Sequence, residues 1–167
     1  MKIFKGFLFA LAVISLSGCV STSDIMIEKS TSDKVNFSGY KTYQIIEGSG
    51  LTDETKVKNV KAVDAEIQKI IVTELAKHGK ALTTEDPDFF VAYLAGNDPK
   101  AVEIKVDKAG HEEIKKAPAS GIVLMFVDAD SGSIIWIATA EGDMKNISMS
   151  ERKERLQYAV KKMLSGL

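Results

Sequence analysis

Residue types that usually carry chemistry are sparse in this chain of 167 residues. Its two histidines, His78 and His111, stand far apart, and no spacing pattern joins them to further metal ligands. Glu85, Asp86 and Asp88 could act as paired carboxylates in acid–base catalysis, but carboxylates around a proline are more typical of a solvated turn. We therefore expect no catalytic residue and no metal site among them.

A second acidic segment, residues 128–132, combines alternate acidic residues with a glycine, as calcium-binding loops do. An EF-hand loop has its glycine at the sixth position and a bidentate glutamate at the twelfth. Here Gly132 is fifth and Thr139 is twelfth, so the segment predicts a hairpin turn instead. Because Gly-x-Ser-x-Gly and Walker-type motifs are missing as well, we expect a protein that is not an enzyme and holds no cofactor.

The single cysteine, Cys19, excludes an internal disulfide and a multi-cysteine zinc site. It is preceded by Lys2 and Lys5, an apolar run over residues 7–14 and then two small residues. This order is typical of a secretory signal peptide. The apolar run is too short to span a bilayer, which needs about 20 residues.

Residues 16–19, Leu-Ser-Gly-Cys, resemble the lipobox of bacterial lipoproteins. The resemblance implies that residues 1–18 are removed, that the Cys19 thiol carries a diacylglycerol, and that the new α-amino group is acylated by a fatty acid such as palmitate. Two or more acyl chains anchor a small domain stably. Val20 replaces the Asp that retains enterobacterial lipoproteins in the inner membrane, which favours the outer membrane with the domain facing the periplasm. The alternatives are an ordinary signal peptide with an unmodified cysteine, or a buried cysteine of a cytosolic protein.

The charge of the chain favours lipid over electrostatic attachment. The net charge is −1; without Lys2 and Lys5, 20 basic residues remain against 23 acidic ones, a net charge of −3. Such a surface attracts neither nucleic acid nor anionic headgroups. Residues 19–24 then form the lipidated N-terminus and a short polar linker, which reaches about 15 Å when extended and keeps the domain close to the membrane.

The periodicity of residues 25–167 predicts a single α+β domain. Apolar residues recur every three or four positions over residues 60–78 and 148–167, as in amphipathic helices, and Ser148 and Glu151 have capping-box spacing. Short connections favour an antiparallel or mixed β-sheet with the two helices packed on one face, a two-layer sandwich. We predict strands at 25–27, 40–46, 89–95 (buried on both faces), 102–106, 122–127 and 134–140, and a surface loop at 108–120.

The same elements carry a family resemblance. The matching positions are residues 37–43 (Phe-Ser-Gly-Tyr-Lys-Thr-Tyr), Asp64, Ile67, Ile71, Leu75, Gly79, Asp88 with residues 89–93, Asp128, Gly132 and Trp136. Together with the lipobox, they resemble the bacterial lipoprotein family of domain of unknown function 4136 over residues 25–166. The resemblance implies an α+β fold and a location in the cell envelope, and it supplies no activity or catalytic residues.

The aromatic residues leave two interpretations open. On strand spacing the only tryptophan, Trp136, shares a face with Ile134 and Ala138, so it either packs under a helix or contacts a ligand or partner. An outward-facing aromatic set would form a patch of the kind found at interfaces. The same alternatives hold for Tyr40, Tyr43 and Tyr93.

The leading functional hypothesis is a non-catalytic, lipid-anchored envelope protein. Its exposed sheet face or edge would bind another envelope component. The alternative from a different class is a periplasmic small-molecule or lipid-binding module with a cleft between helices and sheet. A hydrolase ranks third.

Overall fold

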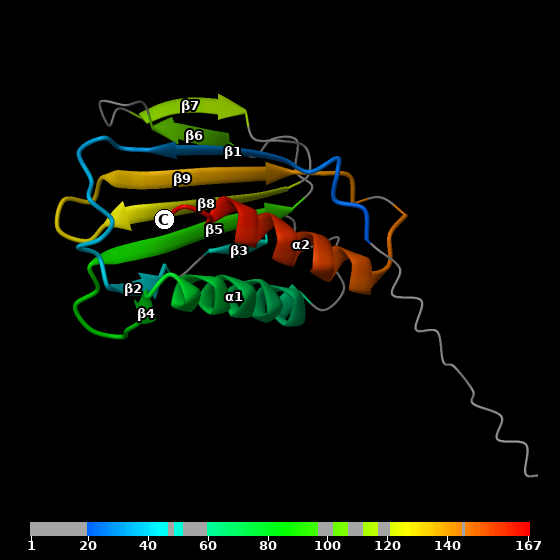
Figure 1. The fold of residues 1–167 in the computed structure, drawn as a ribbon, viewed down its shortest axis with the longest axis horizontal. Coiled ribbons are helices and arrows are strands. Elements are labelled where there is room, and N and C mark those ends of the chain that lie inside the picture. The colour runs from blue at the N-terminus through cyan, green and yellow to red at the C-terminus, as the bar shows by residue number, and fades with distance from the viewer. Residues whose placement is uncertain are drawn as a thin grey trace, which may run out of the picture.

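A computed structural model describes residues 20–46, 49–51, 60–96, 102–106, 112–116, 121–144 and 146–167. Over these residues the chain forms one mixed sheet with two helices packed on one face (Figure 1). The elements in chain order are β1 (Met26–Thr31), β2 (Thr42–Ile45), β3 (Gly50–Leu51), α1 (Val60–Lys77), β4 (Ala81–Leu82), β5 (Phe89–Gly96), β6 (Val102–Val106), β7 (Glu112–Lys116), β8 (Gly121–Asp128), β9 (Ile134–Glu141) and α2 (Met149–Met163). The predicted α+β fold is confirmed.

The sheet combines two kinds of pairing in the order β1-β9-β8-β5-β2-β4, with β3 beside β5. The pairs β1–β9, β9–β8 and β8–β5 are antiparallel, whereas β2 and β3 run parallel to β5, and β4 runs parallel to β2. Because α1 lies between β2 and β4 in the chain, the connection is long enough for parallel pairing. Of the two sheet types predicted, the mixed one is present.

The core lies between the sheet and the two helices. Ile67 and Ile71 of α1, on the predicted helical spacing, are at most 2% exposed. On the sheet, the rings of Phe89, Phe126 and Trp136 pack in succession, with centroids 4.9 and 4.4 Å apart. Aromatic pairs of this kind stabilise a core by roughly 1 kcal/mol beyond the burial of their area.

A β-bulge changes which face one residue of β9 occupies. The antiparallel register between β8 and β9 shifts between Ile134 and Trp136: Trp136 pairs with Phe126, whereas Ile134 pairs with Val127, and Ile135 is the extra residue. Trp136 and Ala138 share the core under the helices, whereas Ile134 packs on the opposite face with Ile137. The prediction that Ile134 shares a face with Trp136 is therefore wrong, because the extra residue of a bulge reverses the alternation of the strand.

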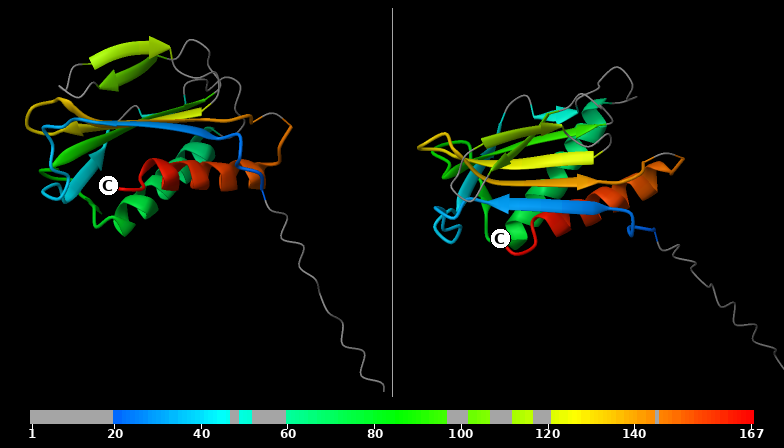
Figure 2. Two further views of the ribbon diagram at one scale, coloured as in Figure 1. Left: turned by 45° about the horizontal axis from the view of Figure 1, so that its top comes forward. Right: turned by 90° about the horizontal axis from the view of Figure 1, so that it is seen from above.

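The sequence predicts a strand buried on both faces at residues 89–95, but β5 alternates buried and half-buried residues. The buried ones, such as Val91 and Tyr93, belong to the core under the helices. The hairpin formed by β6 and β7 lies on the other side of the sheet (Figure 2), where it contacts mainly β9 and β1. It therefore leaves the second face of β5 only partly covered.

Residues 108–120 are predicted as a surface loop, whereas residues 112–116 form β7, paired with β6. In this register Glu103 stands opposite Lys115, and Lys105 stands opposite Glu113. The loop prediction is wrong here because charge alone does not distinguish a loop from a charged strand with a complementary partner. His111 lies outside the described residues.

The predicted capping box at the start of α2 is confirmed. Ser148 caps α2: its Oγ accepts the Glu151 N–H at 3.2 Å, and the Glu151 carboxylate accepts the Ser148 N–H at 2.7 Å. Just after α1, Gly79 has a φ of +70°, in the left-handed region that favours glycine.

The segment predicted as a linker contacts the domain over its described part. Asp24 forms an ion pair with Arg155 of α2, and Arg155 also donates to the carbonyl oxygen of Ser21. Arg155 stands 131 residues from Asp24 in the chain, so the polar composition of the segment gives no indication of this contact.

Two buried tyrosines give a matched test of the core. The Tyr93 hydroxyl donates to Asp64 Oδ1 at 2.6 Å, whereas the Tyr43 hydroxyl has no hydrogen-bond partner within the described residues. We expect Tyr93→Phe to lower the free energy of unfolding by about 1 kcal/mol, and Tyr43→Phe to leave it unchanged or raise it. Urea unfolding measures the difference. If Tyr43→Phe is the less stable variant, this assignment of the two hydroxyls fails.

Candidate functional site

Two hollows in the described part of the chain gather charged side chains. The first, called the helix groove, runs between α1 and α2 and has a volume of about 520 Å³. The second, called the acidic pocket, lies at the end of the sheet where β5 begins and β8 ends, and has a volume of about 680 Å³. In the acidic pocket the carboxylates bind groups of the fold itself, whereas some charged side chains of the helix groove have no partner within the described residues.

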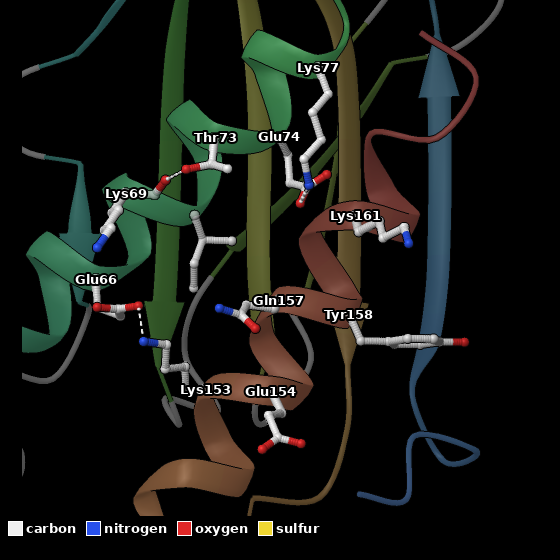
Figure 3. Close-up of a pocket in the computed structure, with 11 residues that line it drawn as sticks. Glu66, Lys69, Thr73, Glu74, Lys77, Lys153, Glu154, Gln157, Tyr158 and Lys161 are labelled. Atoms are coloured by element: carbon white, nitrogen blue, oxygen red, sulfur yellow. Dashed lines mark hydrogen bonds and ion pairs between the residues drawn. The ribbon is translucent and has the colours of Figure 1, made fainter. Parts of the chain in front are cut away.

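The helix groove is open along its length, and charged side chains project into it from both helices (Figure 3). The lining residues of α1 recur three or four positions apart, which places them on one strip of the helix beside its buried stripe. Four lysines and three glutamates dominate the lining. It consists of Glu66, Lys69, Ile70, Thr73, Glu74, Lys77, Lys153, Glu154, Gln157, Tyr158 and Lys161.

Two ion pairs order part of the helix groove. Lys153 of α2 lies 2.8 Å from Glu66 of α1 and bridges the helices, and its hydrogen bond lowers the pKa of Glu66. Within α1, Lys77 pairs with Glu74 at 2.6 Å. Exposed pairs contribute little to stability in water, so their main effect is to position side chains.

Lys69, Lys161 and Glu154 form no ion pair within the described residues, although the charge of Lys69 helps to lower the pKa of Glu66. With four lysines against three glutamates, the lining has one positive charge in excess, in a chain whose net charge is negative. Its lining holds no histidine or cysteine and no paired carboxylates positioned for proton transfer. The arrangement suits the binding of a polar segment that carries carboxylates.

Asp88 in the acidic pocket holds the start of β2. Its Oδ2 accepts the backbone N–H groups of Thr42 at 2.7 Å and of Lys41 at 2.6 Å, and these hydrogen bonds hold its pKa below the ordinary value. The carboxylate therefore stabilises the fold.

Asp128, on the β8 side of the same pocket, holds the hairpin turn. Its carboxylate accepts the Tyr40 hydroxyl at 2.5 Å and the Ser131 N–H at 2.7 Å, and the same two bonds lower its pKa. Burial and the bond to Asp128 raise the pKa of Tyr40 to about 12. Residues 128–132 thus form the predicted turn. No group of three or more His, Cys, Asp or Glu within the described residues is arranged to hold a metal ion.

A buried lysine that the sequence analysis does not single out holds residues 37–43. Lys80 is 6% exposed, and its Nζ donates to the carbonyl oxygens of Phe37 at 2.7 Å and Tyr40 at 2.6 Å. Burial lowers its pKa. The sequence indicates this role of Lys80 only by its position directly after Gly79, between α1 and β4.

The candidate aromatic residues have two kinds of environment. Trp136 is 3% exposed, and Tyr43 and Tyr93 are fully buried, so these three rings pack in the core and are not available to a partner at the surface. Burial of large aromatic side chains stabilises a core. The rings that would have formed the predicted contact patch therefore lie inside the domain. Tyr40 is half-buried, with its hydroxyl on Asp128.

Comparison with known proteins gives one family and several similar folds. A family model described as Domain of unknown function (DUF4136) matches residues 27–167, and no curated protein matches the chain. A DUF4136 family protein from Bacteroides thetaiotaomicron VPI-5482 superposes with a TM-score of 0.57 at 9% identity, covering 83% of this chain and 95% of that one. The PelC dodecamer from Paraburkholderia phytofirmans gives 0.52 at 12% identity, covering 84% and 95%. A PDZ domain protein from Parabacteroides distasonis gives 0.51 at 17% identity, covering 84% and 35%. At these identities the likeness shows the fold alone.

Asp88→Asn tests the structural role of the acidic pocket. A carboxylate with a lowered pKa stabilises the folded state above its ordinary pKa of 3.8 and ceases to do so as the pH falls through its lower folded value. We expect the variant to be less stable than the parent at pH 7, by a margin that shrinks as the pH falls below 3.8. Urea unfolding at a series of pH values measures the margin.

The matched control is Asp86→Asn, because the Asp86 side chain lines the same pocket without a hydrogen bond inside the described ranges. An equal loss of stability in the two variants at pH 7 would count against the assigned role of Asp88.

Proposed function

The chain belongs to the DUF4136 family, and from that premise we propose that it is a lipid-anchored lipoprotein of the bacterial cell envelope that binds another envelope component and catalyses no reaction. The membrane attachment comes from the lipid on Cys19, a residue outside the described part of the chain. Its place is the outer membrane, facing the periplasm.

The anchoring part of the proposal is supported by the order of signals in the sequence. Two lysines, an apolar run over residues 7–14 and the lipobox-like residues 16–19 follow one another, and the predicted domain begins a few residues later, at residue 25. Neither helix of the described chain combines the length and the apolar character needed to cross a bilayer.

The binding part is supported by one observation, the charged helix groove. Lys69 and Lys161 line its two sides without ion pairs in the described ranges, and the Glu66–Lys153 ion pair connects the two helices across it. Carboxylates of a partner segment would satisfy both lysines, since complementary charge favours encounter and register. The partner is thus an envelope protein with an acidic, polar segment.

The alternative is a periplasmic module for a small molecule or lipid. Sites for such ligands are mostly apolar with a few polar groups. The helix groove and the acidic pocket are instead dominated by charged side chains, which favours a polar partner. Native mass spectra with a stoichiometric co-purifying ligand would favour the alternative.

Cys19→Ser tests the anchor. We expect the parent to fractionate with membranes and to carry the mass of a diacylglycerol and an acyl chain on a polypeptide that begins at Cys19, because several buried chains give stable attachment. The variant should move to the soluble fraction. Ser23→Ala is the control and should stay membrane-bound. A Cys19→Ser protein as membrane-bound as the parent, or an unmodified mature Cys19, would overturn the proposal.

Site-specific cross-linking in cells tests the helix groove. A photoreactive amino acid at Gln157, inside the groove, should give an adduct with one partner protein, whereas the same amino acid at Ser131, in the β8–β9 turn, should not. In the protein that carries the photoreactive residue at position 157, the double substitution Lys69→Glu and Lys161→Glu should abolish the adduct, because the partner's carboxylates would then face like charges.

The control for this charge change is Lys34→Glu with Lys41→Glu, two exposed lysines outside the groove, which should leave the adduct intact. A second copy of the chain as the partner would appear as an adduct of twice the mass. An adduct at Ser131 and none at Gln157 would show that the groove is not the binding surface.

A further inference from the structure

The residues that follow Cys19 are held firmly against α2. The guanidinium of Arg155 donates to both oxygens of the Asp24 carboxylate, at 2.9 and 2.5 Å, and also to the carbonyl oxygen of Ser21. This forked geometry is the strong form of a carboxylate–arginine contact. Arg155 is only 4% exposed, so Asp24 is the charged partner that its burial requires. We call this set of contacts the N-terminal clamp.

A third segment closes the N-terminal clamp. The backbone N–H of Asp143, between β9 and α2, donates to Asp24 Oδ2 at 3.0 Å. At Gly142 a Cβ atom would lie 3.0 Å from Arg155 Nη2 and 3.2 Å from the side chain of Ile25, so the absence of a side chain lets the three segments meet. The hydrogen bond from Arg155 lowers the pKa of Asp24 to about 2, so the clamp stays charged at neutral pH.

The clamp leaves almost no free tether. Between Cys19 and the held carbonyl of Ser21 stands only Val20, and each residue spans at most about 3.6 Å. A second contact fixes β1 on α2 further along: Lys29 Nζ donates to the carbonyl oxygen of Ser165 at 2.7 Å, just beyond the end of α2. The lipid-bearing residue is therefore attached to a rigid corner of the domain.

Two exposed methionines lie at this end of the domain. β1 and α2 both begin at this end of the molecule (Figure 1). Met26 and Met149, the first residues of these two elements, are large apolar side chains that are 64% and 67% exposed. The acidic pocket lies at the opposite end of β8, whose eight residues span roughly 26 Å.

We propose that the N-terminal clamp fixes the orientation of the domain on the membrane, with Met26 and Met149 against the lipid headgroups and the acidic pocket directed away from them. The proposal rests on the lipid anchor proposed above. Apolar contact at the membrane end and distance between the acidic pocket and anionic headgroups both favour this orientation. The helix groove runs along the side of the domain, where it stays open to a partner.

Spin labels on the full lipidated chain in vesicles of phosphatidylethanolamine and phosphatidylglycerol test the proposal. Since Cys19 is the only cysteine and its thiol carries the lipid, an introduced cysteine is the one free thiol. We compare Met149→Cys with Ser131→Cys at the opposite end. The label at 149 should be less accessible to a water-soluble nickel relaxation agent, by about threefold or more, because it lies in the interface. Equal accessibility at the two positions would overturn the proposal.

Two changes then separate the clamp from the anchor. Asp24→Asn removes the ion pair, and five Gly and Ser residues inserted between Val20 and Ser21 lengthen the tether while leaving the clamp intact. Each should raise the accessibility at 149 to that at 131, while the chain still floats with the vesicles and keeps the circular dichroism of the parent. Shielding at 149 that survives either change would overturn the orientation proposal. Failure of the parent to float would instead overturn the proposed lipid anchor.

Discussion

Burial of one sheet face beneath α1 and α2 is the constraint from which the surface of this protein follows. Each helix packs an apolar stripe on the sheet, with Ile71 and Val160 fully buried. The polar residues beside those stripes then face one another across the line where the helices meet, and Glu66 and Lys153 bridge it. The helix groove is thus a consequence of how two amphipathic helices cover a sheet. Where β5 begins and β8 ends, the carboxylates of Asp88 and Asp128 bind the backbone N–H groups of neighbouring segments.

Two nearly buried cations hold the parts of the chain that have no regular structure. Lys80 satisfies the carbonyl oxygens of Phe37 and Tyr40, and Arg155 satisfies Ser21 and Asp24. A buried charge is costly unless it is paired or hydrogen-bonded, so each cation strongly disfavours the release of its segment. The carboxylates of the acidic pocket are more exposed, and Asp88 and Asp128 likewise accept backbone N–H groups. The charged groups of Lys80, Arg155 and the acidic pocket therefore stabilise the fold.

The described part of the chain has three distinct regions. The N-terminal clamp and the exposed methionines lie at the end where the chain leaves the proposed lipid anchor. The helix groove runs along the side, and the acidic pocket lies at the far end. Under the proposed lipid anchor, the N-terminal clamp would set the position of all three regions relative to the membrane.

The sequence by itself determined the features that depend on neighbouring residues. Helical and strand periodicity, the capping box at Ser148 and Glu151 and the turn after β8 are all patterns within a few residues, where local geometry and hydrogen bonding act. Only the tertiary structure decided which charged and aromatic residues contact partners inside the fold and which remain at the surface. Tyr40 meets Asp128 across 88 residues, Arg155 meets Asp24 across 131, and β7 needs its partner β6. A periodic pattern carries no information on such distant pairs, because a polar residue looks the same in sequence whether it faces water or its buried partner.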